Sequence, residues 1–420
     1  MSNASNTSNG DHDVVVLGAG YTGMLAAIRL AHRTRRTGVR ITLVNPSERF
    51  TERLRMHQAA TGQELAEHRI RDLLAGTGIT FVRGFATAID ADARTVTVAK
   101  ATVAKMTGDA GTAGPETAVP ETAVLPYDTL VYALGSTTDT GRVPGADAHA
   151  FTLDGQEAAG RLAARLRAAE AAGGTVAVCG AGLTGVEAAT EIAEAHPGLD
   201  VTLISSAEPG SMMGERARTH LNRALDRLGV TVITGAPVAK VLPDAVELAT
   251  GETVPADVCL WTAGVRAPRL ATDAGIETDE RGLVVVDATL RSVSHPDIHA
   301  VGDAAAVRLA WGRLHGTCQS GLPTAQYTAD TIAGLLRGRS PKPFRFGYVH
   351  QPVSLGRHDA VIQFTRADDT PRRAFLKGRA AVLYKEFVSG SPVTAYRLGK
   401  HVNVTATVSR GGRATRAAVA

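Results

Sequence analysis

The sequence predicts an α/β fold with two Rossmann-like domains, followed by a small α+β domain at the C-terminal end. Three observations predict this class. The length of 420 residues suits two to three domains. A short apolar strand that runs into a Gly-x-Gly-x-x-Gly turn and a helix occurs twice, and the turns begin at Gly18 and Gly180. After the second unit, strand-like and helix-like patterns continue through residues 339–395, the expected C-terminal domain.

The composition is that of an ordinary globular protein, with 44% hydrophobic and 20% charged residues. The three cysteines, Cys179, Cys259 and Cys318, are too few and too far apart for a disulfide framework, which favours a reducing compartment. No apolar stretch approaches the ~18 residues of a spanning helix. Residues 1–12 are polar and lack the basic and apolar regions of an export signal. We therefore expect a disordered N-terminus and a cytoplasmic protein.

The net charge of +4 belongs to the C-terminal end of the chain. No acidic residue follows Glu386, whereas five basic residues do: Arg397, Lys400, Arg410, Arg413 and Arg416. The rest of the chain is nearly neutral, which argues against nucleic-acid binding, because that function places a basic footprint on a folded face. We interpret residues 396–420 as a basic, solvated tail. The alternative is peripheral contact of this basic C-terminus with an anionic membrane, at its inner face.

The first unit begins with the β-branched run Val14–Leu17, which is typical of a buried parallel strand. A glycine-rich turn, the helix 24–30 and the strand 40–44 follow directly. In such a unit the first glycine permits the tight turn, the second lets the backbone approach a pyrophosphate, and the third lets helix and strand pack closely. The predicted dinucleotide-binding residues of this turn are Gly18, Ala19, Gly20, Tyr21, Thr22 and Gly23.

The second unit repeats this order with strand 175–179, helix 186–195 and strand 200–204, so the sequence implies two dinucleotides. Its predicted binding residues are Gly180, Gly182, Leu183, Thr184 and Gly185. An acidic residue for the adenosine ribose is expected about 20 positions beyond each turn. Asn45 and Ser205 stand there instead, and both can hydrogen-bond a ribose hydroxyl. The choice between NADH and NADPH stays open.

Between the two units the sequence predicts strands at 81–84, 94–98 and 127–134, and a helix at 155–172. Residues 99–126 are rich in Ala, Thr, Gly and Pro and contain Pro-Glu-Thr-Ala-Val twice in tandem. Because such a composition cannot bury a core of its own, we expect an extended hairpin loop there.

Five motifs occur in an order that resembles one family. They are Gly18-x-Gly20-x-x-Gly23, Tyr127-Asp128-x-Leu130-Val131-x-Ala133-x-Gly135-Ser136, Gly180-x-Gly182-x-x-Gly185-x-Glu187, Trp261-Thr262-Ala263-Gly264-Val265 and Ala300-Val301-Gly302-Asp303-Ala304. Over about 13–340 the chain is similar to flavoproteins with two dinucleotide-binding domains, which include pyridine nucleotide–disulfide reductases and type II NADH dehydrogenases. The resemblance implies that an NAD(P)-binding domain, 151–282, is inserted in an FAD-binding domain formed by 13–150 and 283–338.

The resemblance also implies individual cofactor contacts. Asp303 would meet the FAD ribitol, and Ala86 would line the adenine. A helix that starts near Pro323 and Thr324 would point its positive end at the flavin. The other cofactor-binding residues that it implies are Arg53, Ala133, Gly135, Ala263, Gly264, Gly302 and Ala325.

Within this family the chain resembles type II NADH dehydrogenases. Disulfide reductases keep a redox-active cysteine after the first unit, but residues 48–62 contain none. Leu322-Pro323-x-Ala325-Gln326 is similar to the helix of type II enzymes that faces the quinone, which assigns Gln326 to the acceptor site. Asp330 stands where those enzymes have a second glutamine, and this is a departure from the family pattern.

Two further residues are candidates for catalysis. The resemblance places Glu187 beside the nicotinamide and the flavin, although an acid near the start of a helix also compensates the helix dipole. His57 could give a proton to the reduced substrate, whereas a lone histidine is more often a packing residue.

The C-terminal region predicts a strand at 360–364 and a basic amphipathic helix at 374–388. That helix either lies on a membrane or, as we favour, covers its own sheet. We expect an FAD-dependent oxidoreductase that passes electrons from NAD(P)H to a quinone-like or other conjugated acceptor, without a metal and as a homodimer. Two alternatives stay open: a flavin-dependent oxidase or oxygenase acting on a secondary metabolite, and a flavoprotein redox sensor or binding module.

Overall fold

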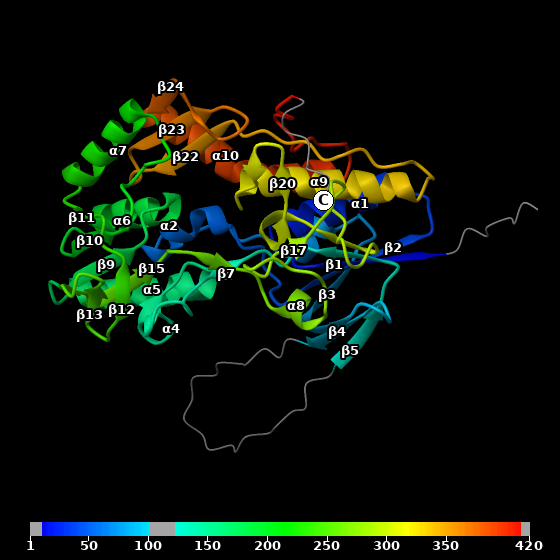
Figure 1. Cartoon of the computed structure of the whole chain (residues 1–420), viewed down its shortest axis with the longest axis horizontal. Coiled ribbons are helices and arrows are strands. Elements are labelled where there is room, and N and C mark those ends of the chain that lie inside the picture. Colours follow the sequence, from blue (N-terminus) through cyan, green and yellow to red (C-terminus); the bar gives the residue numbers. More distant parts are fainter. Residues whose placement is uncertain (1–10, 101–121, 413–420) are drawn as a thin grey trace, which may run out of the picture.

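A computed structural model describes residues 11–100 and 122–412 (Figure 1). Most of the predicted disordered N-terminus, most of the predicted hairpin loop at 99–126 and the last eight residues of the predicted tail lie outside the described residues. The described chain forms two lobes, each built on its own sheet, and a C-terminal part that covers both (Figure 1).

The first lobe has a seven-stranded sheet, and helices α1 (Tyr21–Arg33) and α9 (Cys318–Leu335) lie side by side on one of its faces (Figure 1). The first five strands in spatial order pair in parallel, and the last two are added antiparallel. The order is β18 (Ile298–Ala300), β6 (Thr129–Tyr132), β1 (His12–Leu17), β2 (Val39–Asn45), β3 (Thr80–Asp90), β4 (Thr95–Lys100) and β5 (Thr122–Pro126). The chain therefore leaves this sheet after β6 and returns to it with β18.

The second lobe is made by the intervening chain. Its five-stranded sheet is parallel throughout and packs against helices α5 (Gln156–Glu170) and α6 (Leu183–Ala195). The order is β11 (Thr231–Ile233), β10 (Asp200–Ile204), β9 (Thr175–Cys179), β15 (Val258–Trp261) and β8 (Ala150–Phe151). β9 and β10 have the bounds that the sequence predicted. Two short strands, β7 (Thr137–Thr138) and β16 (Val265–Arg266), pair antiparallel where the chain passes between the lobes.

The C-terminal part consists of an antiparallel sheet and one long helix, α10 (Gly378–Gly399), which touches α1 of the first lobe. The sheet has the order β22 (His350–Ser354), β23 (Ala360–Thr365) and β24 (Pro371–Lys377), and it packs against α6 and α7 (Glu215–Arg227) of the second lobe. The predicted helix at 374–388 was wrong at its start, because residues 374–377 extend β24 and pair with β23.

The predicted basic tail at 396–420 was also wrong for its described residues. Residues 396–399 end α10, and the ring of Tyr396 is fully buried. Beyond the helix, the carbonyl of Val404 accepts a hydrogen bond from Arg29, and the carbonyl of Ser409 accepts one from the backbone of Gly347. The segment therefore packs on the first lobe and is not simply solvated.

The remaining described elements are short connections. They are η1 (Arg53–Arg55), α2 (Met56–Ala60), α3 (Ile70–Leu74), α4 (Ala146–His149), β12 (Val238–Val241), β13 (Ala245–Leu248), β14 (Thr253–Pro255), α8 (Leu270–Asp273), β17 (Val284–Val285), η2 (Gly302–Ala304), β19 (Ala305–Ala306), β20 (Arg308–Leu309) and β21 (Gly312–Arg313). Among these, α2 matters most for the site, because it packs against α6 between the two lobes. No helix in the described residues has the length and apolar character needed to cross a membrane.

Candidate functional site

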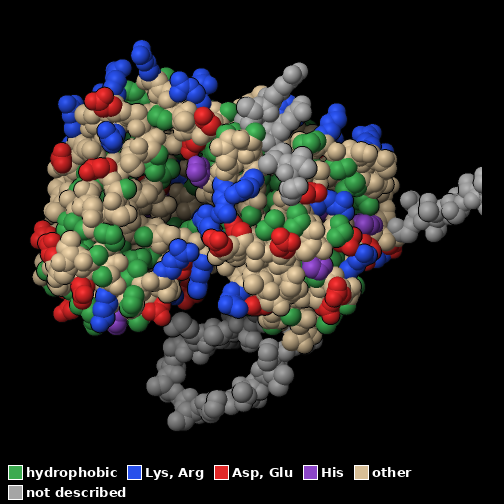
Figure 2. Space-filling view, in the orientation of Figure 1, with side chains coloured by type: hydrophobic (Ala, Val, Ile, Leu, Met, Phe, Trp, Pro, Cys, Tyr) green, Lys and Arg blue, Asp and Glu red, His purple; other side chains and the backbone are tan. Residues whose placement is uncertain are grey.

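A cavity of about 1670 Å³ lies where the two lobes and the C-terminal part meet. Figure 2 shows the surface hollowed between the lobes. The cavity exceeds the 300–1,000 Å³ that is usual for small-ligand pockets. Its walls include the first glycine turn, Leu183 and Thr184 of the second turn, the start of α9, the C-terminal sheet, and residues from α10 onwards. Because both turns open into the same cavity, two dinucleotides bound to them would approach each other there.

The two glycine turns have the same geometry. A Cβ on Gly23 would lie 1.8 Å from the carbonyl oxygen of Gly18, and a Cβ on Gly185 would lie 1.7 Å from that of Gly180. By contrast, a Cβ on Gly20 or Gly182 would meet nothing within 4 Å. The third glycine of each turn is therefore required for packing, whereas the second faces open space in front of a helix start that no side chain of the described residues caps. This is the shape that a pyrophosphate needs.

The structure places four of the six first-turn residues at the cavity wall but only two of the five second-turn residues, since Gly180, Gly182 and Gly185 do not line it. Gly18, Gly20, Tyr21, Thr22, Leu183 and Thr184 line the cavity. Ala19 lies behind the wall, but its backbone N–H donates a 3.0 Å hydrogen bond to Oδ1 of Asn45. The Asn45 amide also donates to the carbonyl of Ser47, so this side chain holds the turn as well as lining the cavity. Ser205 is not among the lining residues, and its hydroxyl accepts from the backbone of Ala207.

Asp303 follows β18 and faces the cavity, where its Oδ2 accepts a 3.0 Å hydrogen bond from the Ser136 hydroxyl. Gly302 has φ of +65°, and its N–H donates to the hydroxyl of Thr324 in α9. Arg53 also lines the cavity, and its guanidinium joins the lobes by binding the Ser136 carbonyl and Asp154. Ala86, Ala133, Gly135 and Gly264 are lining residues too, but Ala263 is not.

The start of α9 differs from the sequence expectation of a helix beginning near Pro323 and Thr324. The helix begins at Cys318, because Thr317 and Ser320 form a capping box that fixes its first turn. Pro323, Thr324 and Ala325 consequently lie inside the helix, buried and away from the cavity wall. The positive end of the helix still faces the cavity, and it is presented there by Gly316, Thr317, Cys318 and Gln319. Burial raises the pKa of the Cys318 thiol to about 12.

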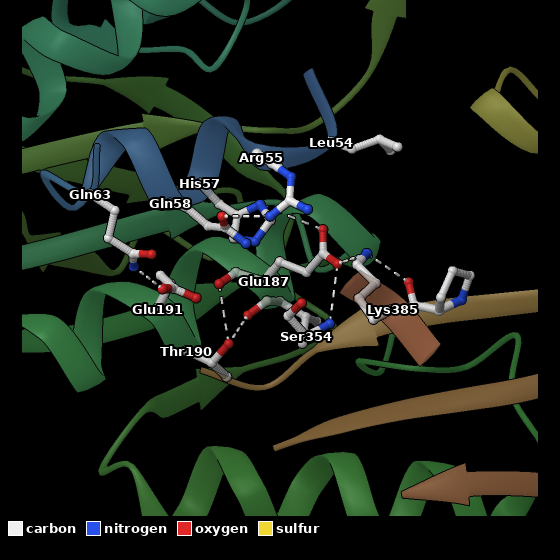
Figure 3. A network of polar contacts seen from close by, with 12 residues as sticks. Leu54, Arg55, His57, Gln58, Gln63, Glu187, Thr190, Glu191, Ser354 and Lys385 are labelled. Atoms are coloured by element: carbon white, nitrogen blue, oxygen red, sulfur yellow. Dashed lines mark hydrogen bonds and ion pairs between the residues drawn. The ribbon is translucent and has the colours of Figure 1, made fainter. Parts of the chain in front are cut away.

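Glu187 of α6 is the centre of a polar network at the cavity wall (Figure 3). Its Oε1 accepts hydrogen bonds from the backbone N–H of Ser354, at 3.1 Å, and from the Lys385 ammonium. Its Oε2 lies 3.9 Å from Nδ1 of His57. Burial acts to raise the pKa of Glu187, but Lys385 and His57 outweigh it, so that this pKa lies below its ordinary value. Glu187 is therefore a carboxylate paired with an ammonium.

Lys385 was not found by sequence reasoning. It lies on α10, almost 200 positions after Glu187, and its side chain is 8% exposed and lines the cavity. It also donates a 3.2 Å hydrogen bond to the carbonyl of Pro352. The sequence shows only a lysine within an apolar helical stretch. Such a pattern does not distinguish a buried lysine from a solvent-exposed one.

His57 lies behind Glu187 rather than on the cavity wall. It is 3% exposed, and burial lowers its pKa to about 4, so that the ring is neutral at pH 7. Its Nε2 has no hydrogen-bond partner among the described residues. The proton donation to a substrate that we expected from His57 would thus have to pass through Glu187.

Gln326 is also displaced from its expected position at the acceptor site. Its Oε1 accepts hydrogen bonds from the backbone of Ala406 and the hydroxyl of Thr405, and it does not line the cavity. One turn further along α9, Asp330 forms ion pairs with Arg29 and Arg33, each at 2.8 Å. This face of α9 therefore anchors the C-terminal segment. The described residues contain no group of three or more metal-ligating side chains that could hold a metal ion.

Comparison with known proteins supplies a context for this geometry. Residues 12–329 match the model of a family described as pyridine nucleotide-disulphide oxidoreductase. An NADH dehydrogenase-like protein of Mycobacterium tuberculosis is 32% identical over 83% of this chain and 86% of its own length. A type II NADH:quinone oxidoreductase of Staphylococcus haemolyticus is 25% identical over 92% of this chain and 98% of its own. The structure of NDH2 from Plasmodium falciparum in complex with NADH matches 93% of this chain and 98% of its own, with TM-score 0.75 and 14% identity, and so shares the fold.

Proposed function

Because the chain belongs to the pyridine nucleotide-disulphide oxidoreductase family, we propose that it is an FAD-dependent NADH dehydrogenase that reduces a quinone. When bound, FAD supplies the redox chemistry, since it takes a hydride from the nicotinamide and gives two electrons to the acceptor. The observation that carries this proposal is the cavity shared by both glycine turns, the start of α9 and the C-terminal part.

The first lobe supplies the groups that FAD requires. The uncapped start of α1 presents backbone N–H groups to the pyrophosphate, in front of the open space at Gly20. Asp303 would accept hydrogen bonds from the ribitol hydroxyls, and Ala86, which also lines the cavity, would face the adenine. The N-terminus of α9 would stabilise negative charge on the flavin ring.

The second lobe supplies the corresponding turn for NADH, with the open space at Gly182 and the uncapped start of α6. Glu187 and Lys385 lie on the same wall as Leu183 and Thr184, so a charged pair would border the place where the two cofactors meet. Residue 205 is a serine, so no acidic side chain at this position would repel the 2′-phosphate of NADPH. The use of NADPH is therefore to be tested beside that of NADH.

The remaining part of the cavity suits an apolar acceptor. The side chains that line it from α9, α10 and the segment after α10 include Leu322, Phe387, Val388, Pro392, Leu398 and Val404. A quinone head group and the start of its tail could be buried among them, because apolar surface is most of what such a ligand offers.

An anaerobic stopped-flow experiment tests the proposal. We expect NADH to bleach the flavin absorbance rapidly, and a short-chain quinone to restore it. NADPH in a parallel trace measures the nucleotide preference. Absence of bleaching with both nucleotides would contradict the proposal and favour a flavin oxidase or oxygenase. Slow bleaching with a change of oligomeric state would favour a redox sensor.

We further propose that the enzyme is peripheral to a membrane, and that α10 makes the contact. Arg379, Leu383 and Phe387 recur every four residues and share one exposed stripe of the helix, where Leu383 is 74% and Phe387 75% exposed. Lys and Arg side chains gather on the adjoining surface over β24 (Figure 2), where Arg372 and Arg373 are exposed. Such a face suits an anionic bilayer. Since Phe387 also lines the cavity, this contact would bring the quinone pool to the acceptor end.

Sedimentation with vesicles that contain anionic lipid tests the membrane contact. Leu383→Ser should weaken binding to the vesicles and leave the reduction of a water-soluble quinone unchanged, because Leu383 does not line the cavity. The exposed Val124, which lies on β5 of the first lobe, provides a matched control as Val124→Ser. Equal vesicle binding by all three proteins would contradict the contact. The homodimer expected from the sequence stays a prediction.

A further inference from the structure

The polar network around Glu187 contains a second buried carboxyl that the proposed function does not use. Glu191 follows Glu187 by one turn of α6, and its side chain is 1% exposed (Figure 3). One carboxyl oxygen, Oε1, accepts a hydrogen bond from the Gln63 amide. The other oxygen, Oε2, is buried and has no hydrogen-bond partner among the described residues.

Protonation of Glu191 would remove the negative charge from this buried carboxyl. An ionised carboxylate in an apolar interior is costly unless both oxygens are satisfied. Burial accordingly raises the pKa of Glu191 to about 7, although Gln63 and Arg357 act to lower it, while Glu194 and Glu187 raise it further. Glu191 can therefore exchange a proton near neutral pH, unlike Glu187, whose carboxylate is held by Lys385.

Glu191 is connected to the surface through charged side chains. Nε of Arg357 lies 3.8 Å from Oε1 of Glu191, and the Arg357 side chain is 35% exposed. On its outer side, Arg357 pairs with Glu386 of α10 at 3.4 Å, and Glu386 also pairs with Arg55. These half-buried ions lie between the solvent-accessible surface, which includes the cavity wall at Glu386, and the buried carboxyl.

His57 lies beside Glu187 on the inner side of this network. It belongs to α2, which packs against α6, and its Nδ1 lies 3.9 Å from Glu187. Its Nε2 is the second buried atom of this interface without a partner among the described residues. A neutral imidazole can accept a proton at one nitrogen while it releases one from the other. The 3.9 Å separation exceeds a hydrogen bond, so transfer to Glu187 requires a small side-chain movement or a bridging water.

Reduction of a quinone needs a supply of protons. This step rests on the proposed function: NADH, one proton and a quinone give NAD⁺ and the quinol, so that each turnover takes one proton from solvent. Glu187 and Lys385 are only 9% and 8% exposed, and both line the cavity. When the cofactors and the quinone fill the cavity, a proton given up there is replaced from the protein side.

We propose that Glu191 is the proton-loading residue of this enzyme. A proton enters past Arg357 and Glu386, is held on the Glu191 carboxyl, and passes to Glu187, one turn earlier on α6, which is paired with Lys385. No bond other than those to the proton is made or broken, and each group returns to its starting charge. Glu191 is thus a positioning residue for the proton and does not touch the substrate.

The test compares Glu191→Gln with Glu194→Gln in the holoenzyme. Glu194 lies on the same helix and also borders Arg357, but it is only half-buried. We expect flavin bleaching by NADH to keep its rate in both variants. Reoxidation by a short-chain quinone should slow by about tenfold or more in Glu191→Gln alone, and lose the pH dependence that the wild type shows near pH 7. Wild-type reoxidation and an unchanged pH profile in Glu191→Gln would overturn the proposal.

A second variant and a second readout keep this test independent of folding and of turnover. Gln63→Leu removes the hydrogen bond that lowers the Glu191 pKa, so the pH profile of reoxidation should move to higher pH; an unmoved profile counts against the relay. Infrared spectra should show a protonated carboxyl band that titrates near pH 7 and is lost in Glu191→Gln but kept in Glu194→Gln. If NADH fails to bleach the wild type, the proposed function fails, and the infrared titration still decides whether Glu191 holds the proton.

Discussion

The ammonium of Lys385 on α10 donates a hydrogen bond to the carboxylate of Glu187 on α6, and both side chains are almost completely buried. This ion pair joins the C-terminal part to the second lobe at the wall of the cavity. Ser354, on β22, adds a backbone hydrogen bond to the same carboxylate. The C-terminal part is thus built into the site through a residue that the two-lobe motifs do not contain.

Lys385→Met should destabilise the protein by about 3–5 kcal/mol, because it leaves the Glu187 carboxylate buried without its counter-charge. Denaturant unfolding measures the change. The double variant with Glu187→Gln should recover much of the loss, since no buried charge is then unpaired. Arg379→Met, an exposed change on the same helix, is the control and should stay within about 0.5 kcal/mol of the wild type. A double variant as unstable as Lys385→Met would contradict this account.

The stability of the protein should depend on pH through Glu191. Its pKa is raised from 4.5 to about 7 in the folded state, so its contribution is fully present below the unfolded value and is lost as the pH rises through about 7. Glu191→Gln should therefore match the wild type near pH 4 and exceed its stability by about 3 kcal/mol at pH 8. Unfolding curves of both proteins across this range measure the difference, and parallel curves would show that Glu191 titrates normally.

The two glycines of the second turn should respond differently to the same substitution. Gly185→Ala places a methyl group against the Gly180 carbonyl and should abolish NADH binding while the first lobe keeps its flavin. Gly182→Ala meets no protein atom and should fold normally, but its methyl group would intrude on the pyrophosphate and raise the KM for NADH. Flavin content and NADH titration separate the two effects. Normal NADH binding by Gly182→Ala would place the dinucleotide elsewhere.

Asp330→Gln introduces the residue that type II NADH dehydrogenases have at this position, yet it should not improve quinone reduction. Asp330 does not line the cavity, and it neutralises Arg29, whose side chain is 10% exposed. Losing this charge should cost about 1–3 kcal/mol of stability, less than a fully buried pair because Asp330 is 28% exposed. Thermal unfolding and quinone-reductase assays test both parts. If Asp330→Gln reduced quinone faster and were as stable as the wild type, this face of α9 would belong to the acceptor site after all.

Sequence patterns were sufficient where the structure depends on neighbours along the chain. The strand at 175–179, its glycine turn and the strand at 200–204 were predicted from apolar runs and glycine spacing, because a βαβ unit is specified locally. The same holds for the N-terminal strand and the first turn. The boundary between β24 and α10 was harder to predict. Apolar and basic residues at 374–377 fit a helix as well as a strand, and their pairing with β23 makes them a strand.

The sequence by itself determined two dinucleotide-binding units and the family, since both follow from short segments with fixed spacing. Tertiary structure alone decided how the site is completed. It placed Lys385 against Glu187, turned Gln326 towards the C-terminal segment, and left Glu191 buried with one oxygen that has no partner in the part of the chain that the structure describes. The physical reason is the same in each case. Burial and pairing of a charged or polar side chain depend on which distant element packs over it, and no local pattern records that.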